Sequence, residues 1–167
     1  MLLNIKAVKR SGQIAFDQTL DLPRVARDVI DIAAISPVHV VGMATYTSPL
    51  LTIEGVVEAR ITYVCSRCLT NFEQDLSTHL LQSYTTDPQQ VDEEIPCLTE
   101  DELDVSENIE EAIFLALDER PLCRTDCKGL CADCGTNLNE HTCGCDTRPI
   151  DPRLAALKDL LSSEQSE

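Results

Sequence analysis

The middle of the chain carries the alternation of apolar and polar residues that is typical of β-strands. Between residues 57 and 64 the odd positions are apolar and the even ones mostly polar, which predicts a strand with one buried face. Two further runs, 38–47 and 50–57, predict strands on either side of a Ser-Pro break. In residues 69–84 three apolar residues recur at even spacings and predict a returning strand: Phe72, Leu76 and Leu80. Residues 38–84 are therefore expected to form an antiparallel sheet.

Helical periodicity occurs in three other segments. Residues 21–34 place Val25, Val29 and Ile32 near one face, and Pro23 falls where the first turn of a helix tolerates proline. A second helix is predicted to begin with Ser106 as its N-cap and to stop at Pro121. Its buried face should comprise Ile109, Ala112, Ile113, Ala116 and Leu117. Residues 151–161 predict a third helix with a stripe made of Leu154, Leu157, Leu160 and Leu161.

The length predicts one domain with an appendage, or two small domains. The chain has 167 residues, of which 43% are hydrophobic and 4% aromatic, so its core has to be aliphatic. Residues 1–122 are assigned to an α+β core, which includes an N-terminal strand marked by Leu3, Ile5 and Ala7. This core includes an acidic loop and helix over 87–119, and its residues 85–104 are expected to form a mobile loop. A cysteine-rich segment follows at 123–150, and 151–167 should form the final helix and a frayed tail.

The negative charge of the chain is concentrated in one segment. The net charge is −16, and residues 87–119 hold 13 acidic residues and no lysine or arginine. Such a block is either a solvated, self-repelling loop or a surface that docks a basic partner such as a ribosomal protein. RNA binding through bulk charge is excluded, because it needs many basic side chains to replace the counterions of phosphates. Any RNA contact therefore has to be local.

The sequence shows no sign of a membrane span or of an export signal. Its apolar runs are far shorter than the ~20 residues of a spanning helix. The N-terminus lacks a basic region followed by an apolar stretch and a cleavage site. A cytoplasmic protein is expected.

Nine cysteines give the strongest chemical signal, and in a reducing compartment this density indicates metal or thiol chemistry. Cys131-Ala-Asp-Cys134-Gly135 has the form of a zinc knuckle, and two nearby thiols can close a tetrahedral site with it. A second pair lies at a predicted hairpin turn, and a third pair follows the second helix. Cys97 stands alone and is interpreted as a free thiol. The candidate zinc ligands are Cys65, Cys68, Cys123, Cys127, Cys131, Cys134, Cys143 and Cys145.

Several alternatives stay open from the cysteine pattern alone. A single site could draw on both clusters, a site could use His141, or the four-cysteine sets could hold iron–sulfur groups. A catalytic zinc site is not expected, because the chain has three histidines and no His-Glu-x-x-His motif. The alternative function is a thiol-redox protein that uses Cys65 and Cys68.

Basic residues accompany the proposed ligands. Arg67, Arg124 and Lys128 lie beside them in the sequence. They either offset the charge of the thiolates or form a small basic face that binds a partner, for example a phosphate backbone.

Three stretches of the chain, Val64–Leu69, Pro121–Gly135 and Asp151–Leu157, resemble in order and spacing the YceD family. Its members are the large ribosomal RNA subunit accumulation proteins of bacteria and plastids, and the match extends over about residues 50–161. The resemblance implies a non-enzymatic factor in the processing or accumulation of large-subunit ribosomal RNA and in ribosome biogenesis. It implies as partner a large-subunit precursor or a ribosomal protein, without a membrane or a small-molecule substrate. The fold expected is an α+β protein whose antiparallel sheet is flanked by about three helices, with a cysteine-rich zinc-binding loop near the C-terminus.

Overall fold

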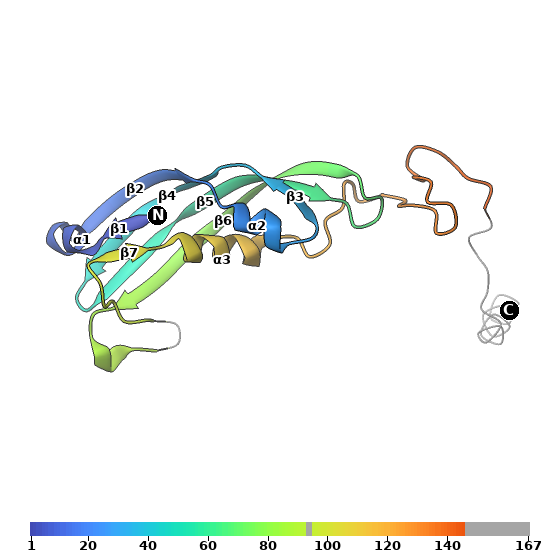
Figure 1. Ribbon diagram of the computed structural model, residues 1–167. Coiled ribbons are helices and arrows are strands. Elements are labelled where there is room, and N and C mark those ends of the chain that lie inside the picture. The colour runs from blue at the N-terminus through green and yellow to red at the C-terminus, as the bar shows by residue number, and fades with distance from the viewer. Residues whose placement is uncertain (93–94, 146–167) are drawn as a thin grey trace, which may run out of the picture.

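The computed structural model describes residues 1–92 and 95–145, and its largest element is a curved antiparallel sheet (Figure 1). Five strands form this sheet, in which β2 pairs with β4, β4 with β5, and β5 with both β3 and β6. The strands are β2 (Gln13–Leu20), β3 (Ile32–Ile35), β4 (Val38–Thr47), β5 (Leu50–Val64) and β6 (Asn71–Thr85). A second sheet pairs β1 (Leu2–Asn4) with β7 (Glu102–Asp104). The helices are α1 (Ile5–Ser11), α2 (Pro23–Asp28), α3 (Ser106–Ala116) and a short 3-10 turn, η1 (Pro88–Gln90).

β5 is the central strand of the large sheet. Its partner β6 pairs with it along its whole length, from Leu50 opposite Thr85 to Val64 opposite Asn71. On the other side β5 pairs first with β4 and then, near its end, with β3. Among the strands of the described residues β6 pairs only with β5, so it is the outermost of them on its side of the sheet.

The core lies between one face of this sheet and the helices, which cover it from below in the view of Figure 1. The odd positions of β5 point inward, and Leu51, Ile53 and Ile61 are completely buried. The helices contribute apolar side chains that are buried in the same cluster: Ile5 and Val8 from α1, Val25 from α2, Ile109 and Ile113 from α3. The period-two pattern of residues 57–64 therefore identified the buried face of β5. On the predicted face of α3, Ile109 and Ile113 are buried, Ala112 and Leu117 are half-buried, and Ala116 is exposed.

The α+β class with an antiparallel sheet and three helices is confirmed, but the helices are not the expected three. The helix predicted over 21–34 is wrong beyond Asp28, because residues 32–35 form β3 instead. The part of β5 that follows its pairing with β4 has an edge free for another strand, and Ile32 and Ile35 pair with it. This pairing outweighs the helical preference that the local spacing of apolar residues indicated. The helix predicted at 151–161 lies outside the described residues.

The N-terminal region also differs from the prediction. The strand stops at Asn4, whose side chain accepts a hydrogen bond from the backbone N–H of Ala7 and caps α1. Neither α1 nor β2 was expected. The two strands predicted at 50–57 and 57–64 are one continuous strand, β5.

The acidic region folds more than predicted. Residues 85–104 were expected to be a mobile loop, yet they contain η1, the strand β7 and a parallel bridge between Thr85 and Cys97. α3 begins at Ser106, but the Ser106 hydroxyl donates to Asp104 and does not act as the N-cap. The helix ends at Ala116, which is exposed, and thus five residues before Pro121. No helix among the described residues has the length and apolar character of a membrane span.

Candidate metal centres

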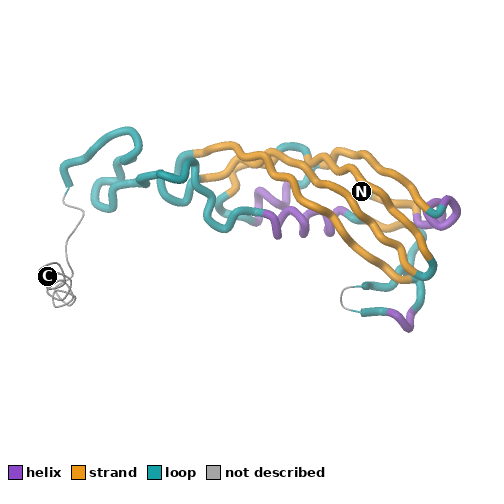
Figure 2. Tube along the Cα trace, turned by 180° about the vertical axis from the view of Figure 1, so that it is seen from behind, coloured by secondary structure: helices purple, strands orange, loops and turns teal. Residues whose placement is uncertain are grey.

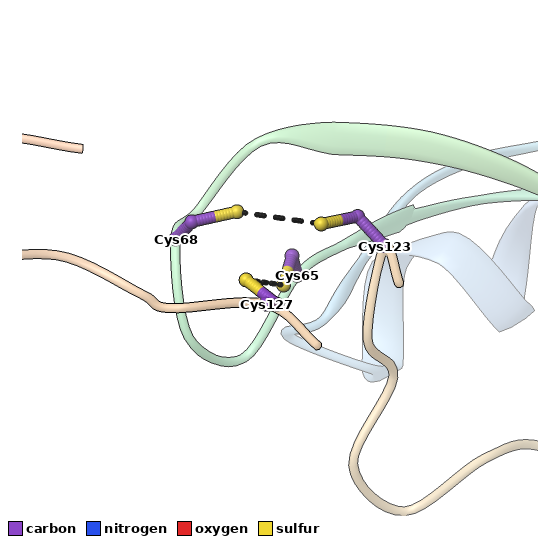
Figure 3. A group of neighbouring side chains, drawn as sticks. All are labelled: Cys65, Cys68, Cys123 and Cys127. Carbon is purple, nitrogen blue, oxygen red and sulfur yellow. Dashed lines mark hydrogen bonds between the residues drawn. The ribbon is translucent and has the colours of Figure 1, made fainter. Parts of the chain in front are cut away.

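Eight of the nine cysteines gather in two groups of four at one end of the sheet. Site 1 combines Cys65 and Cys68, from the turn between β5 and β6, with Cys123 and Cys127, from the segment after α3 (Figure 3). Site 2 lies entirely in the C-terminal segment and consists of Cys131, Cys134, Cys143 and Cys145. All nine cysteines are free thiols. Figures 1 and 2 show the C-terminal segment after α3 extending away from the end of the sheet.

The sulfur atoms of each group are close enough to share one metal ion. Within each site all four lie within 4.8 Å of one another. In site 1 the Sγ atoms of Cys65 and Cys127 are 3.8 Å apart, and those of Cys68 and Cys123 are 3.6 Å apart. Four sulfurs bound tetrahedrally to one zinc ion at ~2.3 Å lie about 3.8 Å from one another. Thiolates around a four-iron cluster each bind a different iron atom and lie farther apart, so this spacing favours a single tetrahedral ion.

The same six-residue turn supplies the first two ligands of both sites. In Cys65–Thr70 the N–H of Leu69 donates to the Cys65 carbonyl, and the N–H of Cys65 donates to the Thr70 carbonyl. In Cys131–Thr136 the corresponding bonds join Gly135 to Cys131 and Cys131 to Thr136. The sequences Cys-Ser-Arg-Cys-Leu-Thr and Cys-Ala-Asp-Cys-Gly-Thr are therefore a short internal repeat. Only three of the six positions are identical, so the repeat is not apparent from the sequence alone.

The fifth residue of each turn has a positive φ, 58° at Leu69 and 73° at Gly135. Glycine adopts this conformation without strain, whereas a side chain costs about 1 kcal/mol there. Gly135 thus suits the tight turn of the backbone after Cys134. Leu69 holds the same turn at an energetic cost, which indicates that the rest of site 1 enforces it.

Hydrogen bonds fasten the segment after α3 onto the β5–β6 turn. The backbone N–H of Ser66 donates to the Pro121 carbonyl, and the N–H of Leu130 donates to the Arg67 carbonyl. The Arg67 guanidinium donates to the carbonyl oxygen of Cys127 at 2.9 Å. Gly129, at a φ of 75°, lies so near that a Cβ there would meet the Arg67 carbonyl at 3.0 Å. Ligands 55 or more residues apart in sequence are held together in this way.

Asn139 lies in the chain between Cys134 and Cys143 of site 2 but contacts site 1, and sequence reasoning missed it. Its side-chain oxygen accepts from the Arg124 guanidinium at 2.6 Å and from the backbone N–H of Lys128 at 2.8 Å. Its amide nitrogen donates to the sulfur of Cys127 at 3.4 Å. Hydrogen bonds to a ligand sulfur orient it and stabilise its thiolate form. An asparagine in a polar loop carries no pattern that would have identified this role.

The two sites differ in burial. At site 1 Cys65, Cys68 and Cys127 are buried, and the apolar side chains of Phe72, Leu122 and Leu130 pack around them. At site 2 only Cys131 is buried, while Cys134 and Cys145 are exposed. Site 1 is therefore the closed end of the folded core, and site 2 is an appendage.

Each site combines thiols of low and high pKa. At Cys65 burial opposes ionisation, but backbone N–H donors of Cys123, Cys68 and Arg67 prevail and lower the pKa to about 6. Burial and the neighbouring sulfurs raise the pKa of Cys123 to about 12. At site 2 hydrogen bonds from Thr136 lower the pKa of Cys134 to about 6, and the Cys134 and Cys131 sulfurs raise the pKa of Cys145 to about 12. Neighbouring thiolates repel each other, so without a cation some of the cysteines keep their protons. A divalent metal ion would displace these protons when it binds.

The structure also places the remaining candidate residues. Cys97 is half-buried beside Thr85 and belongs to neither group. His141 is exposed and is not among the grouped ligands. Arg67 and Arg124 use their guanidinium groups to hold Cys127 and Asn139. Lys128 is exposed, and no hydrogen bond or ion pair of its side chain occurs within the described part of the chain.

Comparison with known proteins assigns the chain to a family. The model of a family described as "Large ribosomal RNA subunit accumulation protein YceD" matches residues 53–161, which is more than half of the chain. The chain belongs to the YceD family. The resemblance found in the cysteine turns is thereby confirmed, and the match includes all eight grouped cysteines.

Relatives in bacteria and plants extend this finding. An uncharacterized protein of Mycobacterium leprae is 28% identical over 93% of this chain and 75% of its own length. The uncharacterized protein YlbN of Bacillus subtilis is 26% identical over 89% of this chain and 88% of its own. A chloroplastic YCED homolog 1 of Arabidopsis thaliana, named for large ribosomal RNA subunit accumulation, is 24% identical over 86% of this chain. The chain spans 54% of the length of that plant protein. No solved structure matches the chain significantly.

Proposed function

We propose that this YceD-family chain is a non-enzymatic zinc protein that supports the processing and accumulation of large-subunit ribosomal RNA. Two structural zinc ions, one in each site, hold the C-terminal segment in a fixed shape at the end of the sheet. The family name supports the role in accumulation of the RNA. Thiolate ligands need a reducing compartment, which agrees with a cytoplasmic location.

The spacing of the sulfur atoms is the observation that carries the metal proposal. At site 1 the two measured separations, 3.6 and 3.8 Å, agree with a single tetrahedral ion and require no rearrangement of the ligands. Four cysteine sulfurs occupy all four positions of such an ion, whereas catalytic zinc keeps one position open for water or substrate. The arrangement therefore supports a structural site.

The thiol-redox alternative has less support. A redox pair needs an accessible thiolate, but Cys65 and Cys68 are 0% and 5% exposed. The low pKa of Cys65 favours its thiolate form, which suits a metal ligand as well as a nucleophile. Figure 3 shows Cys65 and Cys68 directed at Cys127 and Cys123, respectively.

Elemental analysis of the purified protein tests the metal proposal. We expect about two zinc ions per chain and no stoichiometric iron, because each site has a full set of thiolates for one ion. A thiol reagent applied under native conditions should modify Cys97 and leave the eight ligands largely protected. A metal-free protein in which Cys65 and Cys68 form a reversible disulfide would favour the redox function instead.

Partner binding is proposed at the basic residues near site 1. A zinc ion with four thiolates carries a net charge of about −2, so Arg67, Arg124 and Lys128 partly offset it. The two arginines already hold the fold, which leaves Lys128 as the side chain best placed to contact a phosphate. The partner is a precursor of the large subunit, reached through its RNA or through a ribosomal protein.

The variant Lys128→Glu tests this contact without removing a hydrogen bond of the site. We expect weaker co-sedimentation with large-subunit precursor particles. The slope of the logarithm of the binding constant against the logarithm of the salt concentration should become shallower by about one. Arg10→Glu is the matched control, because Arg10 is exposed on α1, at the other end of the sheet. Equal binding of both variants and the native chain would contradict a role of Lys128 in binding.

A further inference from the structure

The outer edge of β6 presents backbone groups that the sheet does not use. Thr85 donates its N–H to the Pro96 carbonyl, and its own carbonyl accepts from Leu98, so both groups point away from β5. Backbone groups alternate in direction along an antiparallel strand. Ser77, His79 and Leu81 therefore direct their N–H and C=O groups outward as well. Within residues 1–92 and 95–145 β6 pairs along this stretch with β5 alone.

A groove runs beside this edge, between β6 and α3. It has a volume of about 450 Å³, and its walls include Leu81 and Leu115, which are 70% and 83% exposed. A second hollow of about 580 Å³ continues it past Leu81 to Ile95 and Pro96. Residues 96–98 of the chain already pair with the outer edge of β6 at Thr85 and then turn away from it. A strand in the groove would extend this pairing along the same edge of β6.

The edge lacks the features by which proteins usually prevent strand pairing. Exposed edges carry lysine, proline, a bulge or inward charges. Residues 76–83 contain no proline, no lysine and no carboxylate, and the register of β6 with β5 is continuous. An uncharged edge of eight residues beside two exposed leucines has the form of a peptide-binding site of the strand-addition type.

The charge around the edge selects the occupant. Glu111 lines both hollows, and Glu54 lies next to Leu81 on the opposite face of the sheet. No lysine or arginine occurs from residue 69 to residue 119. A second copy of this chain would bring its own Glu54 and Glu111 against these carboxylates, and like charges repel.

We propose that the β6 edge binds an extended basic peptide segment of a partner protein by β-strand addition. The segment forms backbone hydrogen bonds with Ser77, His79 and Leu81. Its side chains alternate between the two faces of the sheet: those on the side of α3 lie in the groove near Leu115 and Glu111, and those on the other face lie near Leu81 and Glu54. This inference adds a partner to the proposed function but needs neither metal site, so its failure leaves the zinc proposal intact.

The test uses the zinc-loaded 167-residue chain and a fluorescein-labelled peptide of alternating lysine and valine, about eight residues long. We expect saturable binding by anisotropy, and slower hydrogen exchange at the amides of Ser77, His79 and Leu81. Leu81→Lys, which puts a positive charge into the groove, and His79→Pro, which removes an outward N–H, should each weaken binding about tenfold. The same peptide with glutamate in place of lysine should not bind.

Val41→Lys is the matched control. Val41 is 43% exposed on the outer face of β4, so this variant makes a comparable change of charge two strands away from the edge. Its affinity for the peptide should equal that of the native chain. Absence of binding, or equal weakening by Val41→Lys and Leu81→Lys, would overturn the proposal. Slow exchange of the three amides without peptide, in a monomer or a dimer, would also overturn it, because the edge would already be occupied.

Discussion

Removal of zinc by a chelator is expected to unfold residues 123–145 and the turn 65–70 while the sheet stays folded. The segment 123–145 has few apolar side chains and contains no helix or strand of its own, apart from the bridge between Leu130 and Asn137. Metal ligation is therefore its main source of folding free energy, which amounts to about 10–16 kcal/mol for structural zinc in small domains. The sheet has an independent aliphatic core that includes Ile53, Ile61 and Ile113.

Hydrogen exchange before and after chelation measures this outcome. Amides held by the metal-dependent turns, such as those of Leu69, Leu130 and Gly135, should lose their protection. Amides in the centre of β5 should retain theirs. Loss of protection throughout the chain would show instead that the sheet depends on the metal, and unchanged protection would show that the cysteine segment does not.

Loss of one ligand should have a larger effect at site 1 than at site 2. Cys65→Ser removes a completely buried ligand at the end of β5 and releases the segment that contains Cys123 and Cys127. We expect the free energy of unfolding to fall by about 4 kcal/mol. This is the stabilisation that a zinc ion gives when its free concentration is about a thousand times its dissociation constant. Cys134 is exposed in the appendage, so Cys134→Ser should lower the stability of the sheet by less than about 1 kcal/mol.

Urea unfolding monitored by circular dichroism, together with zinc analysis, separates these effects. Each variant should lose about one zinc ion per chain, but only Cys65→Ser should markedly lower the midpoint. Cys97→Ser is the control, because Cys97 belongs to neither group and the variant should keep both ions. Equal destabilisation by Cys65→Ser and Cys134→Ser would mean that site 2 is as much a part of the folded core as site 1.

The proposed edge and the metal sites lie on different parts of the molecule. The cysteine sites are at the end of the sheet where the chain leaves it (Figures 1 and 2), whereas the groove is lined by residues of β6 and α3. A partner with both phosphates and extended basic segments, as expected of a ribosomal precursor, could use both surfaces together. Two weak contacts of this kind bind more tightly than either does alone.

The sequence by itself determined the features that depend on local spacing. The alternation in 57–64 located the buried face of β5, and the helical period located Ile109 and Ile113 on α3. The close spacing of Cys131, Cys134, Cys143 and Cys145 predicted a self-contained group of sulfurs, because a short loop suffices to bring them together.

Only the tertiary structure decided what depends on distant segments. Residues 32–35 form a strand because β5 offers them a free edge, although their local spacing is helical. Cys65 and Cys68 meet Cys123 and Cys127 because hydrogen bonds from Ser66 and Arg67 hold the segment after α3 against the turn. Asn139, the strained Leu69 and the open edge of β6 leave no mark in the sequence, because each depends on which backbone groups and side chains of remote segments come within hydrogen-bonding distance.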